Sequence, residues 1–159
     1  MEIVFAPPAG KAIQNPSLEM LRDLVFQYEQ NYWRRGSGDA KLYAAKRPLY
    51  RDGALASGRA IALMGLSFKE PYGFHVSHSF SGEDDYVAIS SHDYTETAEL
   101  ILEGNPWNIP VAFFVPREAA WDAVQEFIES GTRSAKLEWV KLCEQVWGGE
   151  TTKRNESGL

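Results

Sequence analysis

The sequence predicts an α+β fold in which one antiparallel β-sheet of four to six strands is packed by an N-terminal and a C-terminal helix. Three observations support this prediction: an amphipathic segment over residues 16–33, a second over residues 117–130, and short β-rich runs between residues 40 and 115. Two helices that bracket a succession of strands are typical of α+β domains with an antiparallel sheet.

The first helix is expected over residues 16–33. Asn15 is expected to cap it, and Pro16 to take the first helical position, where the missing N–H of proline costs nothing. Apolar residues then recur at steps of three and four, which is the spacing of one helical stripe: Leu18, Leu21, Val25, Tyr28 and Tyr32. The Gly-Ser-Gly-Asp segment at 36–39 is expected to end this helix.

Strands are expected at 40–45, 60–66, 72–80, 86–90, 97–103 and 111–115, with a loop rich in Gly, Pro and Arg at 48–58. Within 72–80, alternation sends the aromatic positions and His78 to one face, and His75, Ser77 and Ser79 to the other. Residues 81–85 are expected to form a hairpin turn with an acidic tip. The run 97–103 also contains good helix formers, but the Gly-Asn-Pro segment that follows it favours a strand.

The second helix is expected over residues 117–130, with Gly131 as its C-cap and four apolar residues on one face: Ala120, Val124, Phe127 and Ile128. Residues 137–146 are expected to form a last short strand or helix. The polar segment 150–159 lacks an apolar anchor and is predicted to be disordered. Residues 1–149 are therefore expected to form a single domain.

Composition indicates a reducing, cytoplasmic setting. The chain has 159 residues, of which 44% are hydrophobic. This is enough to build a hydrophobic core that needs no disulfide bond or structural metal ion. Its one cysteine, Cys143, excludes an internal disulfide. Residues 1–10 lack the basic and apolar regions of a signal peptide, and no run of about 18 apolar residues suggests a membrane span.

The charge of the chain is concentrated in its middle. The net charge is −6, and residues 60–112 hold a single Lys, Lys69, against eight Asp or Glu residues. Such a segment argues against nucleic-acid binding, which needs clustered cations, and would suit a basic protein partner.

Motifs for catalysis or for cofactor binding are not found. His75 and His78 are three residues apart on a strand, so they are expected on opposite faces and cannot share a metal ion. His92 and Asp93 are adjacent, so they too are expected to point in opposite directions and cannot share a metal ion. No nucleophile elbow and no phosphate-binding glycine loop are present in the sequence. The sequence therefore predicts a protein that is not an enzyme and binds no metal or cofactor.

The C-terminal third carries four short motifs: Gly-Asn-Pro-Trp at 104–107, Val-Pro-Arg-Glu-Ala-Ala at 115–120, Glu-Phe-Ile-Glu-Ser-Gly-Thr-Arg at 126–133 and Leu-Glu-Trp at 137–139. These resemble the end of the immunity-protein family found beside deaminase and other bacterial polymorphic toxins. The end of the first helix before residues 36–40 fits that family more loosely. Ser134 is a departure, because the family often has Pro after the Arg.

The resemblance implies a cytoplasmic inhibitor that occludes the active site of a cognate toxin delivered by secretion or by contact. The toxin could be a deaminase, a nuclease or an NAD-hydrolysing enzyme. An inhibitor of a basic active-site cleft should present carboxylates, so the acidic section is the predicted toxin-binding surface. Its predicted residues are the tip Glu83, Asp84 and Asp85, the neighbours Asp93, Glu96 and Glu99, and the aromatic anchors Tyr86 and Tyr94.

Other interpretations stay open at this point. The acidic tip could serve only solubility. The chain could be a small hydrolase that uses His75 or His92 with nearby acids, or a generic protein-interaction module.

Overall fold

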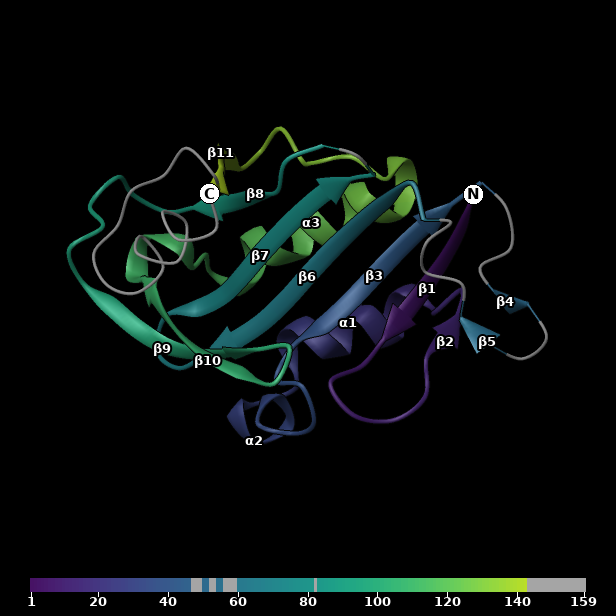
Figure 1. Ribbon diagram of the computed structural model, residues 1–159, viewed down its shortest axis with the longest axis horizontal. Helices are drawn as coiled ribbons and strands as arrows, with labels where there is room; N and C mark the ends of the chain where they lie inside the picture. Colours follow the sequence, from purple (N-terminus) through teal and green to yellow (C-terminus); the bar gives the residue numbers. More distant parts are fainter. Residues whose placement is uncertain (47–49, 52–53, 56–59, 82, 143–159) are drawn as a thin grey trace.

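The computed structural model describes residues 1–46, 50–51, 54–55, 60–81 and 83–142, and it confirms the α+β class (Figure 1). Its centre is a seven-stranded sheet of antiparallel strand pairs in the order β11-β8-β7-β6-β3-β1-β2. This sheet is larger than the four to six strands predicted, because segments near both chain ends join it.

The strands of this sheet are β1 (Glu2–Ala6), β2 (Ile13–Gln14), β3 (Ala40–Ala45), β6 (Ala62–Lys69), β7 (Gly73–Phe80), β8 (Tyr86–Ile89) and β11 (Glu138–Lys141). Two smaller sheets pair β4 (Tyr50–Arg51) with β5 (Ala54–Leu55), and β9 (Thr97–Leu102) with β10 (Asn105–Pro110). The helices are α1 (Leu18–Phe26), α2 (Gln30–Trp33), the 3₁₀ helix η2 (Val111–Phe113) and α3 (Arg117–Ser130). The predicted strands at 40–45, 60–66, 72–80, 86–90 and 97–103 are confirmed, apart from small shifts at their ends.

The first helix is shorter than the predicted 16–33. Asn15 cannot cap it, because the side chain of Asn15 accepts the N–H of Ile3 and so belongs to the β1–β2 pair. Ser17 caps α1 instead, its hydroxyl accepting the N–H of Met20 at 3.1 Å. The helix stops at Phe26, where the Arg117 guanidinium donates to the carbonyl oxygens of Val25 and Tyr28.

Two members of the predicted apolar stripe therefore lie at the surface. The side chain of Leu18 is 54% exposed at the start of α1, and Tyr28 lies beyond the end of that helix and is 38% exposed. Leu21 and Val25, which fall inside α1, are buried as the stripe predicts.

The predicted strand at 111–115 is wrong. Residues 111–113 form η2, and only Val115 bridges to β7, through its pair with Phe74. A strand that the sequence reading missed, β10, comes just before them and contains two prolines. Those prolines are tolerated because β10 pairs with β9 alone. Glu103 and Gly104 connect the two strands with φ angles of 51° and 79°, as in a two-residue type I′ turn.

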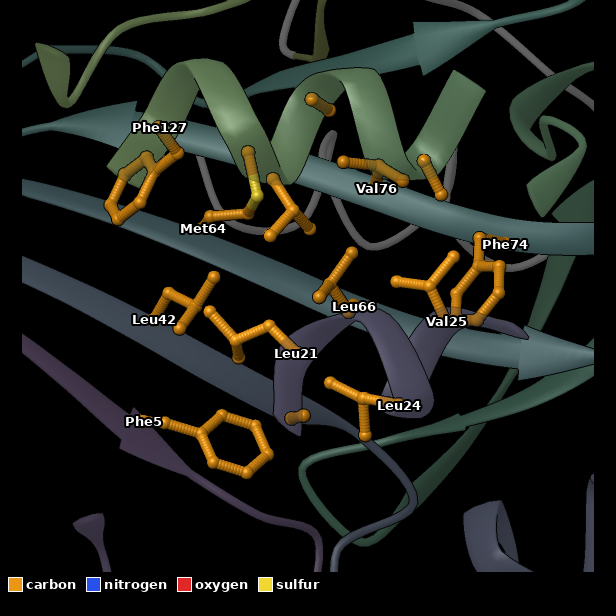
Figure 2. Close-up of a cluster of buried hydrophobic side chains, with 14 of the residues drawn as sticks. Phe5, Leu21, Leu24, Val25, Leu42, Met64, Leu66, Phe74, Val76 and Phe127 are labelled. Carbon is orange, nitrogen blue, oxygen red and sulfur yellow. The ribbon is translucent and has the colours of Figure 1, made fainter. Parts of the chain in front are cut away.

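The second helix is confirmed at 117–130, with Gly131 as a left-handed C-cap at a φ of 73°. Together, α1 and α3 cover one face of the sheet. Figure 2 shows the core between them, in which side chains of both helices meet those of the central strands. Its labelled members are Phe5, Leu21, Leu24, Val25, Leu42, Met64, Leu66, Phe74, Val76 and Phe127.

A second apolar cluster lies on the other face of the sheet, at the end occupied by β8. The β9–β10 hairpin and η2 pack there against β8. Its buried members are Val87, Ile89, Leu100, Ile109, Ala112, Phe113 and Phe114. Because the hairpin is narrower than the sheet, it covers only part of this face (Figure 1).

Several predictions fall on residues outside the described ones. These are the terminal segment 150–159, Cys143, and most of the loop at 48–58, in which only β4 and β5 are described. Within the described part of the chain, no helix is both long and apolar enough to cross a membrane.

Truncation of Phe127 should weaken the core. This side chain is fully buried between α3 and the sheet, so we expect Phe127→Ala to lower the free energy of unfolding by about 3–5 kcal/mol. Urea unfolding followed by circular dichroism measures the change. Gln125→Ala, at an exposed position of the same helix, is the control and should stay within about 0.5 kcal/mol of wild type.

Candidate functional site

A groove lies on the sheet face opposite to α1 and α3. Alternation along the central strands brings Lys41, Gly65 and Ser77 into one row across β3, β6 and β7. In the next row, Ser67 of β6 pairs with His75 of β7. Gly65 in the middle of the first row has no side chain, and the Ser77 hydroxyl lies close to the place where its Cβ would be.

The groove encloses a cavity of about 270 Å³. The sheet supplies its floor, the β9–β10 hairpin supplies one wall, and Asp85 and Leu142 also contribute. Its lining is mixed. Apolar side chains come from Leu63, Leu102, Trp107 and Leu142, and polar ones from Asp39, Lys41, His75, Ser77, Ser79, Asp85, Glu103 and Asn105.

The tip of the hairpin is fastened to the start of β3. Asp39 Oδ1 accepts the backbone N–H of Glu103 at 3.1 Å, and Ser37 O accepts that of Gly104 at 2.9 Å. Lys41 Nζ lies 2.5 Å from Glu103 Oε1. Burial lowers the pKa of Lys41, but the hydrogen bond and the charge of Glu103, with Asp39, outweigh it and raise that pKa above its ordinary value. Lys41 therefore remains a cation that is already paired.

His75 is the most buried titratable base of the groove. Its side chain is 7% exposed, the Phe114 ring packs edge-on against it, and neither ring nitrogen has a hydrogen-bond partner among the residues that the structure describes. Burial lowers the pKa of His75 from 6.5 to about 4. The imidazole is consequently neutral at pH 7, with one nitrogen that can accept a hydrogen bond and one that can donate.

His78 lies on the other face, as predicted from the odd spacing to His75. Gly131 O lies 2.8 Å from its Nε2, and Arg133 Nη1 lies 3.3 Å from its Nδ1. Because a guanidinium can only donate, Nδ1 accepts and Nε2–H donates to Gly131. The Arg133 guanidinium also lies over the Tyr86 ring at 3.8 Å, so this histidine fastens the end of α3 to the sheet.

The predicted acidic tip is exposed. Glu83, Asp84 and Asp85 lie at the β7–β8 connection, and Asp84 Oδ2 lies 3.8 Å from Lys141 Nζ. Glu83 and Asp85 make no ion pair with another described residue. Asp85 also lines the groove, so the tip and the groove are neighbours.

The remaining predicted acids form a separate group at the other end of β8. Asp93, Glu96 and Glu99 are all exposed, and hydrogen bonds from Thr95 lower the pKa of Asp93. The four-residue strand β8, about 13 Å long at the usual rise of a strand, and residues 90–92 lie between this group and the tip. The predicted carboxylates therefore form two groups along one margin of the molecule rather than one patch.

The two predicted aromatic anchors are engaged within the fold. Tyr86 lies beneath Arg133, and Tyr94 packs edge-on against Phe113 with ring centroids 5.2 Å apart. Burial, followed by the charge of Glu138, raises the pKa of Tyr94. Both rings are partly exposed, so a binding partner could contact only the exposed part of each ring.

Sequence reasoning missed the groove residues Asp39, Lys41, Glu103 and Trp107. They come from three elements that only the tertiary structure brings together. One signal was available: Gly65 interrupts an otherwise strand-forming run, and glycine inside a strand often marks a place where another group approaches closely.

Three polar residues of the groove are of types that also occur in catalytic sites. His75, Ser77 and Asp39 line the same groove, yet none is hydrogen-bonded to another, as a nucleophile and its base would be. Across the described ranges, no group of three or more His, Cys, Asp or Glu residues could hold a metal ion. His92 lies at the surface, with its Nε2 2.8 Å from Glu138 Oε2.

The chain was compared with models of known protein families and with curated proteins, and neither comparison gives a match.

Acid should destabilise this protein through His75. Its pKa is lower in the folded than in the unfolded state, so its contribution to stability is complete above pH 6.5 and is lost as the pH falls towards 4. Between pH 7 and 4.5, wild type should lose about 2.5 kcal/mol more unfolding free energy than His75→Phe. Urea unfolding at both pH values measures the difference. His92→Gln, which removes an exposed imidazole, should behave as wild type, and an equal loss in His75→Phe would contradict the prediction.

Proposed function

We propose that this chain is an immunity protein that binds a cognate toxin, of deaminase, nuclease or NAD-hydrolysing type, and inhibits it by occluding its active site. The observation that carries the proposal is the margin formed by residues 83–99. No Lys or Arg occurs in the chain between Lys69 and Arg117, whereas this margin exposes two groups of carboxylates. Surfaces of one charge sign steer and select partners of the opposite sign.

The few cations near this margin leave most of its charge unbalanced. Lys141 pairs with Asp84, and His92 pairs with Glu138. Glu83, Asp85, Glu96 and Glu99 have no ion pair with any residue that the structure describes. An enzyme that handles nucleic acid or a phosphorylated cofactor has a basic cleft, and such a cleft would complement this margin.

The motifs of the resemblance lie mainly in regular secondary structure. The four motifs of the resemblance fall on β10, on α3 with its approach, and on the segment that enters β11. Trp139 Nε1 donates to the carbonyl of Ser134 at 2.9 Å, which holds the turn where the family often has proline. Preorganised surfaces lose little conformational entropy on binding, as a tight inhibitor requires.

Charge reversal at the tip tests the proposal. Replacing Glu83, Asp84 and Asp85 together by Lys should slow association with the toxin about 10- to 100-fold at low salt and abolish protection in cells that co-express the toxin encoded beside it. Stopped-flow binding at several salt concentrations and growth assays measure the two effects. The same replacement of Asp93, Glu96 and Glu99 tests the second group separately.

The matched control reverses Glu19, Glu118 and Glu129, three exposed acids on the helices of the opposite face. It changes the net charge by the same amount and should still protect cells. Protection by both margin variants, at wild-type level and with unchanged thermal melts, would refute the margin as the toxin-binding surface.

A hydrolase is the second candidate, favoured by the shared groove of His75, Ser77 and Asp39. An inhibitor should not react with a fluorescent phosphonate that labels activated serines. Labelling of the wild type that is lost in Ser77→Ala, read on a denaturing gel, would favour the hydrolase instead.

A further inference from the structure

Two deeply buried polar side chains of the groove have hydrogen-bonding capacity left over. The side chain of Asp39 is 6% exposed, and its carboxylate accepts a single hydrogen bond, from the Glu103 N–H. That of His75 is 7% exposed and accepts none from the described residues. A carboxylate can accept about four hydrogen bonds, and the remaining capacity of both groups is accessible from the groove, because Trp33 Nε1 is the only described side-chain nitrogen or oxygen atom that is fully buried without a partner. The groove therefore presents acceptors for a ligand that is rich in donors.

Charge around the groove favours a cation. Its carboxylates are Asp39, Asp85 and Glu103, and its only Lys or Arg among the lining residues is Lys41. Lys41 Nζ is paired with Glu103 at 2.5 Å and is also attracted by Asp39, but one cation offsets only one of the three negative charges. An anionic ligand would meet this excess of negative charge, whereas a cation would relieve it.

The shape of the groove favours one slender group. A volume of about 270 Å³ lies just below the ~300–1,000 Å³ of pockets that enclose whole small molecules. A side chain at position 65 would collide with the Ser77 hydroxyl, because a Cβ there would lie 2.6 Å from Ser77 Oγ. Leu102 and Trp107 of the hairpin supply an apolar wall for an aliphatic stem.

We propose that this groove receives one arginine side chain of a protein partner, with its guanidinium between Asp39 and His75 and its stem along Leu102 and Trp107. Extending the β3–β6 register by one residue places Asp39 opposite Ser67, which pairs with His75, so about two strand spacings (~10 Å) separate the backbones of Asp39 and His75. We expect a planar group with five donors to reach both acceptors across this spacing better than the compact ammonium of lysine does. The partner is the toxin only if the proposed function holds.

Three small probes test the groove without any toxin: N-acetyl-arginine N-methylamide and its citrulline and lysine analogues. Citrulline matches arginine in shape but has no charge. In ¹H–¹⁵N spectra of the full chain, the arginine probe should shift the amide signals of Gly65 and Ser77 at millimolar concentration. The citrulline and lysine probes should bind at least about tenfold more weakly.

Variants separate a specific site from general attraction. Asp39→Asn keeps an oxygen for the Glu103 N–H, so the fold should persist while the preference for arginine over citrulline is lost. His75→Phe should weaken the arginine probe several-fold. In the double variant Gly65→Val with Ser77→Ala, the valine fills the groove and the alanine removes the Ser77 Oγ with which it would clash. This variant should abolish the amide shifts caused by the arginine probe. Glu19→Gln removes the same charge on the opposite face and should bind as wild type.

The proposal is overturned if no probe shifts Gly65 or Ser77, if citrulline binds as tightly as arginine, or if well-folded Asp39→Asn binds the arginine probe as wild type does. Each result concerns the groove alone, whereas loss or retention of protection in the charge-reversal experiment concerns the acidic margin. Failure of one proposal is therefore distinguishable from failure of the other.

Discussion

The alternation of side chains along β6 and β7 is the constraint on which the rest of the molecule depends. Large apolar residues, such as Met64 and Val76, point to one face and require α1 and α3 as a cover. The intervening positions are mostly small or polar, and among the described residues the β9–β10 hairpin and η2 cover part of this other face. The fold thus has a sealed face and an open face, and both proposed binding features belong to the open face or its margin.

The parts of the fold that could be predicted from the sequence are those in which local pattern and tertiary packing agree. The alternation in β7 and the capped amphipathic pattern of α3 were sufficient signals. The first helix was predicted too long because a stripe of apolar residues does not reveal that the helix ends at Phe26, where Arg117, far away in sequence, donates to the carbonyls of Val25 and of Tyr28 beyond the helix. β10 was missed because its two prolines look like breaks, and only its position beside a single neighbour makes them harmless.

The candidate site was less predictable for a related reason. Residues that are close in sequence, such as Glu83, Asp84 and Asp85, could be recognised as a group from composition alone. The groove instead joins Asp39 to His75 through the register of three strands, and no local pattern indicates that register. Asp39 becomes buried beside His75 only when the hairpin tip, whose Glu103 N–H donates to Asp39, is in place.

The outer strands of the large sheet have a consequence for how this protein behaves at high concentration. β2 has two residues and β11 has four, whereas the central β6 and β7 have eight each. An edge strand offers its unpaired N–H and C=O groups to any other extended chain, and a short edge offers few of them. The short edge strands β2 and β11 therefore protect this wide antiparallel sheet from edge-to-edge association. We expect recognition by this molecule to depend on its side chains rather than on the backbone of these edges.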